Sequence, residues 1–144
     1  MLIDKLEVKE TGEEILAHKD HPFPHTSFYV EPEMYPGGFI PWHWHSDVEV
    51  MYVVQGRMEL RTNMGEYSLS AGDAVYINSN VLHFQKPCAG IKAITLNQVF
   101  DISLISGRHN SIFEQKYVEP LLNCREIDVM LFRQSDVRQR KIID

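Results

Sequence analysis

The stretch GGFIPWHWHSDVE at residues 37–49 decides the fold. In an extended strand successive side chains point to opposite faces, so His43, His45 and Glu49, all odd-numbered, project to the same side. The even-numbered residues of this region, which include both tryptophans, project to the other side. As the strand continues, both faces are largely apolar, which indicates that both are covered. A sheet closed into a barrel and packed on its outside by a second element has this property.

Short β-rich runs with glycine-bearing turns surround this stretch. We expect strands at 26–30, 48–54, 57–62, 66–69, 74–77 and 91–99. Such spacing is typical of an antiparallel sandwich or barrel. The periodicity then changes, and residues 102–122 are expected to form short amphipathic helices. Residues 128–144 are expected to give a last strand followed by a helix start or a linker.

The predicted fold is therefore all-β with a small helical carboxy-terminal part. The chain has 144 residues, which fits one domain of ordinary size. Within it we distinguish a proline-rich arm at 1–41 that contributes strands, a barrel core at 42–100, and a helical segment with the start of a linker at 101–144. Two cysteines, Cys88 and Cys124, are expected to be reduced thiols.

Charge and hydropathy exclude some classes of partner. The net charge of −6 argues against nucleic-acid contact by this chain itself. No apolar run approaches the roughly 20 residues that span a bilayer, so no membrane partner is expected. The first ten residues carry an acid at position 4 and no apolar signal core, and we expect a cytoplasmic protein.

The odd-numbered face carries the groups that indicate chemistry. Burying two imidazoles and a carboxylate without partners costs several kcal/mol. A divalent transition metal (Zn, Ni, Fe or Mn) would satisfy His43, His45 and Glu49, and His83 is the best candidate for a fourth ligand. The alternative is that these histidines hydrogen-bond to carbonyls or carboxylates and bind nothing.

A ligand pocket is expected beside this cluster. Met51 and Val53 share the parity of the proposed ligands, and His25 precedes a strand at the expected pocket mouth. Arg57 would face inward, and could pair with an anionic effector, only if no bulge shifts the register at Gly56. Otherwise Arg57 is a surface charge on an exposed strand.

These residues resemble the two motifs of the cupin superfamily. The first motif is matched without a gap by Gly37, His43, His45, Glu49 and Gly56. The second is matched by Gly72 and His83, but Asn78, Asn80 and Pro87 stand where proline, glycine and asparagine are usual. The resemblance implies a jelly-roll barrel, and all four metal-ligand positions are retained.

A narrower resemblance covers almost the whole chain. The runs HWHSDVEVMYVVQG (43–56), YSLSAGDAVYINSNVLH (67–83), FDISLI (100–105) and KYVEPLL (116–122) are similar to the amino-terminal sensing domain of AraC-type transcription regulators. That resemblance implies a barrel that binds a small effector, such as a sugar or another polar metabolite, and that forms a homodimer. DNA binding would belong to helix-turn-helix units outside this chain, which is either an isolated sensor domain or a piece of a longer regulator.

Two functions remain open at this point. The first is a small-molecule-binding sensor domain with a divalent-metal site in its barrel. The second is a small metal-dependent cupin enzyme, such as a dioxygenase or an isomerase. Few further ionisable residues have inward parity, which favours the sensor and leaves no catalytic residue to assign.

Overall fold

The computed structural model describes residues 2, 3 and 5–144, with only the backbone of Leu2 and Ile3. The expected arm at 1–41 thus includes two positions, 1 and 4, that lie outside the described residues. The strands are β1 (Leu2–Ile3), β2 (His25–Val30), β3 (Ile40–His43), β4 (Val48–Gln55), β5 (Arg57–Thr62), β6 (Glu66–Ser70), β7 (Ala74–Ile77), β8 (His83–Pro87), β9 (Ile94–Phe100) and β10 (Val129–Phe132). The helical elements are η1 (Pro32–Met34), α1 (Ser103–Ser106), η2 (Glu114–Val118), α2 (Glu119–Leu122) and α3 (Val137–Ile143).

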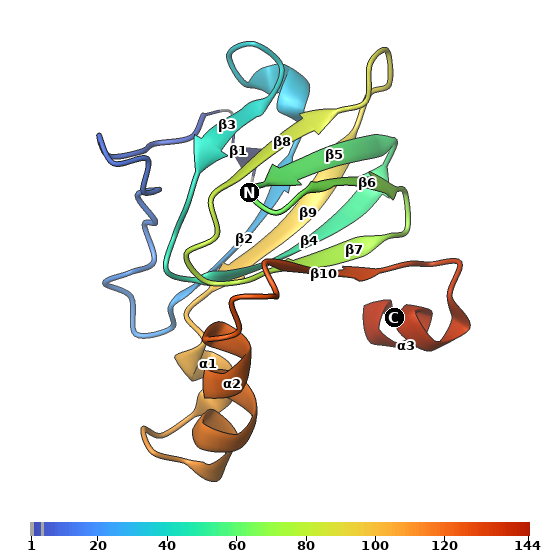
Figure 1. Cartoon of the computed structure of the whole chain (residues 1–144). Coiled ribbons are helices and arrows are strands. Elements are labelled where there is room, and N and C mark those ends of the chain that lie inside the picture. The colour runs from blue at the N-terminus through green and yellow to red at the C-terminus, as the bar shows by residue number, and fades with distance from the viewer. Residues whose placement is uncertain (1, 4) are drawn as a thin grey trace.

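The strands form two sheets that face each other as a jelly-roll barrel (Figure 1). One sheet has the order β1-β2-β9-β4-β7-β10 and the other the order β3-β8-β5-β6. Every pairing between named strands is antiparallel except that of β1 with β2. This confirms the predicted all-β class, and the strand bounds expected from the sequence differ from the observed ones by at most three residues. Strands β3 and β8, which carry two of the histidines, were not predicted as separate strands.

The core lies between the sheets and follows the two-residue period of the strands. In β4 the odd-numbered Glu49, Met51 and Val53 are buried, whereas in β5 the even-numbered Met58 and Leu60 are buried. Parity therefore switches across the Gln55–Gly56 turn. Burying side chains of this size contributes about 1.5–3 kcal/mol each to folding. The two inner faces thus supply most of the stability that holds the barrel closed.

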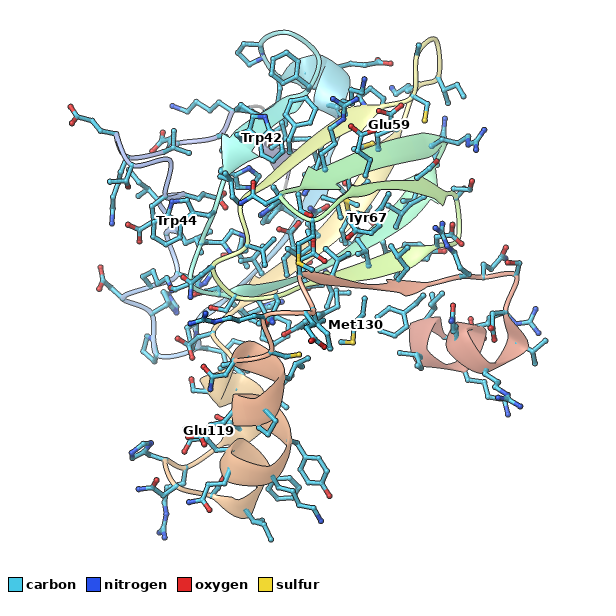
Figure 2. The ribbon with its side chains drawn as sticks, in the orientation of Figure 1. Trp42, Trp44, Glu59, Tyr67, Glu119 and Met130 are labelled. Atoms are coloured by element: carbon cyan, nitrogen blue, oxygen red, sulfur yellow. The ribbon has the colours of Figure 1, made fainter. Side chains whose placement is uncertain are left out.

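The amino-terminal arm pairs with the chain between His43 and His45. Glu13 forms a parallel bridge with Trp44, and the amide of Glu14 donates to the Trp44 carbonyl at 2.8 Å. Figure 2 shows Trp44 on the side of the barrel where this arm runs, and its indole nitrogen donates to the carbonyl of Thr11 at 3.1 Å. Bridge partners share a face and neighbours alternate. Because Trp44 faces outward between two inward histidines, Glu13 faces outward and Glu14 faces inward.

The helical segment leaves the barrel after β9 and returns to it as β10. Elements α1, η2 and α2 project from one end of the barrel, and α3 lies beside β10 (Figure 1). Strand β10 pairs with β7, and α3 begins where the Asp136 side chain accepts from the amides of Arg138 and Gln139. The prediction of a last strand followed by a helix is therefore confirmed. No helix within the described part of the chain has the length and apolar character needed to cross a membrane.

Candidate metal centre

Strand register brings the four predicted ligands together. His43 ends β3 and is paired with His83, the first residue of β8, so their rings lie 4.1 Å apart between centroids. His45 follows two residues after β3, and Glu49 lies on the inward face of β4. One ligand atom from each of the four side chains lies within 4.8 Å of the other three, and no side chain is more than 3% exposed. This buried cluster fits a divalent metal site.

Backbone carbonyls orient all three imidazoles. Each ring places Nδ1 at 2.8–2.9 Å from a carbonyl oxygen two residues away: His43 at Pro41, His45 at Asp47 and His83 at Val81. A carbonyl can only accept, so each Nδ1 carries the proton and donates it. In the neutral form of each ring the proton is then on Nδ1, and Nε2 is the atom with which a histidine so oriented binds a metal.

The four ligand atoms fit a metal because the cluster has too few hydrogen-bond donors to pair all of them. The Nε2 atom of His83 is buried and has no hydrogen bond within the described part of the chain, although it lies 3.4 Å from Glu49 Oε2. His45 Nε2 lies 3.2 Å from the same oxygen. The other oxygen of Glu49 accepts from the amide nitrogens of Asn97 and Gln85. Three imidazole nitrogens and one carboxylate oxygen, which suit Zn, Ni, Fe and Mn, therefore converge without competing donors.

The electrostatics of the cluster favour the metal-binding forms of two of the four side chains, His43 and Glu49. Burial, reinforced by the neighbouring His83, lowers the pKa of His43 to about 3. Burial alone would raise the pKa of Glu49, but the imidazoles of His45 and His83 hold it well below its usual range. Burial also opposes the charged form of His45, but its hydrogen bond to Glu49 and the nearby carboxylates give it a raised pKa. At neutral pH Glu49 is thus ionised and His43 is neutral, as metal ligation requires.

A small cavity of about 20 Å³ borders the cluster. Its polar wall consists of Glu14, His43, Glu49, Gln85 and Asn97, and its apolar wall of Leu6, Phe28, Val30, Tyr35 and Ile40. A space of this size holds about one water molecule. Burial raises the pKa of Glu14 to about 7. The arm therefore places a second carboxylate at the edge of the metal centre.

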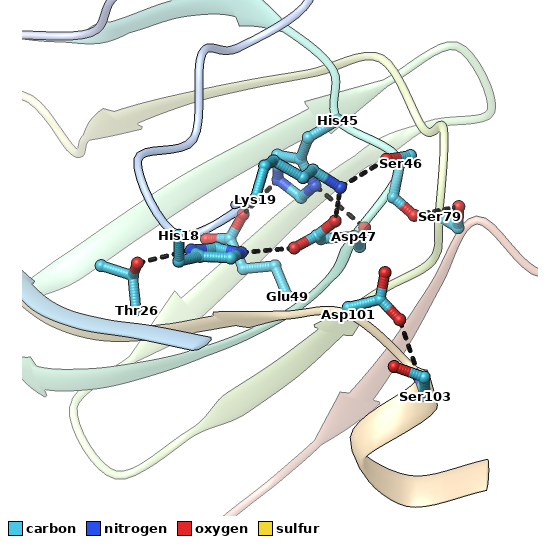
Figure 3. A network of polar contacts seen from close by, with 10 residues as sticks. All are labelled: His18, Lys19, Thr26, His45, Ser46, Asp47, Glu49, Ser79, Asp101 and Ser103. Atoms are coloured by element: carbon cyan, nitrogen blue, oxygen red, sulfur yellow. Dashed lines mark hydrogen bonds and ion pairs between the residues drawn. The ribbon is translucent and has the colours of Figure 1, made fainter. Parts of the chain in front are cut away.

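A second buried network supports the turn between His45 and Glu49 (Figure 3). His18 places Nε2 at 2.6 Å from the Asp47 carboxylate and Nδ1 at 2.5 Å from Thr26 Oγ1. Lys19 also contacts the Asp47 carboxylate. Because the Asp47 carbonyl orients His45, the arm holds the metal centre from outside as well as lining its cavity.

The predicted pocket residues do not line this cavity. Met51 and Val53 face inward as predicted but are part of the packed core. His25 lies on the outward face of β2, where it hydrogen-bonds to Gln98 at 2.8 Å. Arg57 does not face inward, because the turn at Gly56 reverses the parity and leaves it exposed. The pocket role expected for it is therefore wrong, and the alternative of a surface charge on an exposed strand is what the structure shows.

Other residues of the site were not identified from the sequence. Gln85 and Asn97 have a detectable signal, since each is a polar residue at an inward position of an alternating strand. His18 lies in a polar, proline-rich segment of the sequence, yet it is only 5% exposed. Neither His18 nor Glu14 belongs to a periodic pattern, so the sequence offered no signal for them.

Comparison with known proteins agrees with this architecture. Residues 30–84, which contain all four clustered side chains, match the family described as "Cupin domain". This match and the two antiparallel sheets support a cupin domain with a jelly-roll fold. Along 139 residues it is 24% identical to an uncharacterised HTH-type transcriptional regulator of Bacillus subtilis, YdeC, covering 95% of this chain and 46% of that protein. The chain thus spans about half the length of this curated relative.

Solved structures with a similar fold are more distant. A cupin-like protein from Thermotoga maritima has a TM-score of 0.49 and 19% identity, covering 62% of this chain and 67% of its own. An Escherichia coli pirin, YhhW, solved in complex with nickel(II), has a TM-score of 0.41 and 15% identity, covering 43% of this chain and 29% of its own. An oxalate decarboxylase structure has a TM-score of 0.47 and 21% identity, covering 55% of this chain and 22% of its own.

Proposed function

We propose that this chain is the sensor domain of a transcription regulator and that it binds a divalent transition metal through His43, His45, Glu49 and His83. The observation that carries the metal site is the orientation of all three imidazoles by backbone carbonyls, which directs three free Nε2 atoms to one carboxylate. The regulator function is supported by the alignment with an HTH-type regulator, which extends over 95% of the chain and so beyond the barrel.

The size of the cavity restricts the effector. A space of about 20 Å³ takes the ion's small ligands but no sugar. We therefore propose that the species recognised in this arrangement is the metal ion with a small polar ligand. A sugar or another larger polar metabolite would require the wall formed by Leu6 and Glu14 to move.

We further propose a cytoplasmic homodimer that does not itself contact DNA. Apolar side chains remain more than half exposed on the helical segment, namely Ile105, Ile112, Phe113 and Tyr117. Such a patch is typical of an interaction surface, and a second copy of the chain is the occupant we expect. DNA contact would belong to a helix-turn-helix unit of a longer protein, since this chain has a net charge of −6.

One observation favours the alternative of a metal-dependent cupin enzyme. A carboxyl group with a pKa of about 7, that of Glu14, is suited to proton transfer near neutral pH. If the chain were an enzyme, a bound ion would supply Lewis-acid activation and Glu14 would hold or release the proton. Turnover of small substrates by the metal-loaded protein would favour this alternative over the sensor.

The direct test of the metal site is elemental analysis of protein purified without chelator. We expect about one equivalent of transition metal in the parent protein and almost none in His45→Ala, because a structural or catalytic ion needs its full ligand set. His109→Ala is the matched control, since His109 is an exposed histidine of the helical segment. A parent protein that stays essentially metal-free, even after incubation with zinc, nickel, iron or manganese, would remove the proposed site.

A further inference from the structure

The cavity beside the cluster is rich in hydrogen-bond acceptors that lack donors. Gln85 is 2% exposed, and its Oε1 atom is buried without a hydrogen-bond partner within residues 5–144. The side-chain amide nitrogens of Gln85 and Asn97 both donate to Glu49. The side-chain oxygen of Asn97 accepts from the Thr95 hydroxyl at 2.7 Å. A buried acceptor left unpaired costs about 1–3 kcal/mol. The cavity therefore favours an occupant that donates hydrogen bonds.

Glu14, which belongs to the amino-terminal arm, adds a second hydrogen-bond acceptor to the cavity. Its backbone is fixed by its amide hydrogen bond to the Trp44 carbonyl, next to the bridge between Glu13 and Trp44. Its inward side chain lines the cavity together with Glu49. The Glu14 carboxylate makes no hydrogen bond or ion pair with any residue that the structure describes. It is also outside the group of four whose ligand atoms lie within 4.8 Å of one another. Glu14 is thus placed to act beyond the direct ligands, across a space of about one water molecule.

We propose that Glu14 is a further residue of the metal centre, where it accepts a hydrogen bond from a water-sized ligand in the cavity and selects neutral ligands against anions. This inference rests on the proposed metal site. A divalent ion in place favours the ionised form of Glu14, so the carboxylates of Glu49 and Glu14 together balance its charge. An added anion would then bring uncompensated negative charge into a buried space, which is strongly unfavourable. Without Glu14 the centre keeps a net positive charge and accepts an anion.

The test compares azide binding to the cobalt(II)-loaded full chain before and after neutralising Glu14. Azide binding is followed by the visible absorption of the cobalt ion. In Glu14→Gln we expect azide to bind about tenfold more tightly, because removing a nearby charge in a partly buried site changes the binding energy by that order. Glu13→Gln is the matched control, since Glu13 is the adjacent residue of the arm, faces outward and pairs with Lys9 at 2.7 Å.

The outcomes separate this inference from the metal site itself. If the parent binds cobalt and Glu14→Gln binds azide within about twofold of the parent, the role of Glu14 is overturned while the metal site stands. If the parent gives no cobalt absorption bands, the metal site fails and this inference fails with it. Circular dichroism checks that the variant folds, and Glu14→Ala, for which the same tightening is expected, replaces it if it does not.

Discussion

The imidazole of His18 lies 2.6 Å from the carboxylate of Asp47, and neither side chain is more than 5% exposed. The backbone carbonyl of the same Asp47 accepts the Nδ1 proton of His45 at 2.9 Å. One residue therefore joins the amino-terminal arm to a proposed metal ligand, through its side chain on one side and its main chain on the other. Groups that hold a ligand histidine in this way contribute to metal affinity without touching the ion.

Replacing His18 by alanine should weaken both folding and metal binding. The Asp47 carboxylate would stay buried with Lys19 as its remaining charged contact, and we expect a loss of about 2 kcal/mol in the free energy of unfolding. Zinc affinity should fall about tenfold, because the carbonyl that orients His45 loses its support. Urea denaturation and competition with a chromophoric chelator measure the two effects. His21→Ala, an exposed neighbour, should change neither, and unchanged zinc affinity in His18→Ala would show that the network does not act on His45.

The contribution of His43 to the stability of the metal-free protein should decrease as the pH falls below about 6.5. The pKa of His43 is lowered to about 3 by burial, so between these two values the unfolded chain holds a proton that the folded chain does not. The contribution of His43 is therefore complete above the unfolded value and decreases toward acid. His45 and Glu14 act in the opposite sense, because the pKa of His45 is raised and burial raises that of Glu14 to about 7, so stability decreases as the pH rises through these folded values. Urea denaturation with chelator from about pH 7.5 to 5 measures the net slope.

The variant His43→Gln isolates the share of His43 in this slope. Its amide does not titrate, so on going from about pH 7.5 to 5 the variant should lose less stability than the parent, or gain more. Glu49 does not change the difference in slope between parent and variant. Because its pKa is lowered, its contribution to stability is lost only at lower pH. An equally steep slope in parent and variant would contradict the assignment to His43.

Metal should raise the thermal stability of the parent protein but not that of a ligand variant. A ligand that binds only the folded state at about 100 times its dissociation constant adds about 2.7 kcal/mol. We therefore expect an increase in Tm on adding zinc to chelator-treated parent, and none for Glu49→Gln, whose neutral amide is a poor ligand. Differential scanning calorimetry at several zinc concentrations measures the effect. An increase of the same size in Glu49→Gln would indicate that zinc binds elsewhere.

Gly56 should be far less replaceable than another glycine of similar backbone conformation. Its φ is +79°, and a Cβ there would lie 2.2 Å from the carbonyl oxygen of Lys92, whereas Gly90, with φ +74°, has nothing within 4 Å. We expect Gly56→Ala to cost about 3 kcal/mol and Gly90→Ala about 1 kcal/mol, the latter from backbone conformation alone. Urea denaturation of the pair measures the difference. Similar losses in both would show that the close approach of Lys92 is relieved by the loop.

The sequence predicts the fold and the four clustered side chains because both depend on a strict two-residue alternation. His43, His45 and Glu49 share parity, from which a single extended strand was predicted to bring them together. That strand is not observed: His43 ends β3 and Glu49 lies in β4 of the other sheet, and the three side chains meet because the chain turns between His45 and Glu49. His83 could be added because its own segment repeats the pattern of a strand entrance. Alternation of side chains is a local property of a strand, so it can be read directly from the sequence.

The same alternation explains the error at Arg57. A shift of one residue exchanges the two faces of a strand, and the turn at Gly56 introduces such a shift between β4 and β5. Glu14 and His18 could not be predicted for another reason. They reach the site from an arm with little regular structure, about thirty residues before the ligands that they approach, where no periodicity links position to direction.

The bridge between Glu13 and Trp44 determines how much of the chain must be moved to transplant the centre into another scaffold. The segment that defines the cupin match, residues 30–84, would carry the four clustered side chains but leave behind Glu14, His18 and Asn97. A graft limited to that segment would reproduce the four clustered side chains without the arm and the part of β9 that cover them, and water would reach them. A faithful graft begins before residue 14 and continues through β9, so it is more than half again as long as the segment that matches the cupin family.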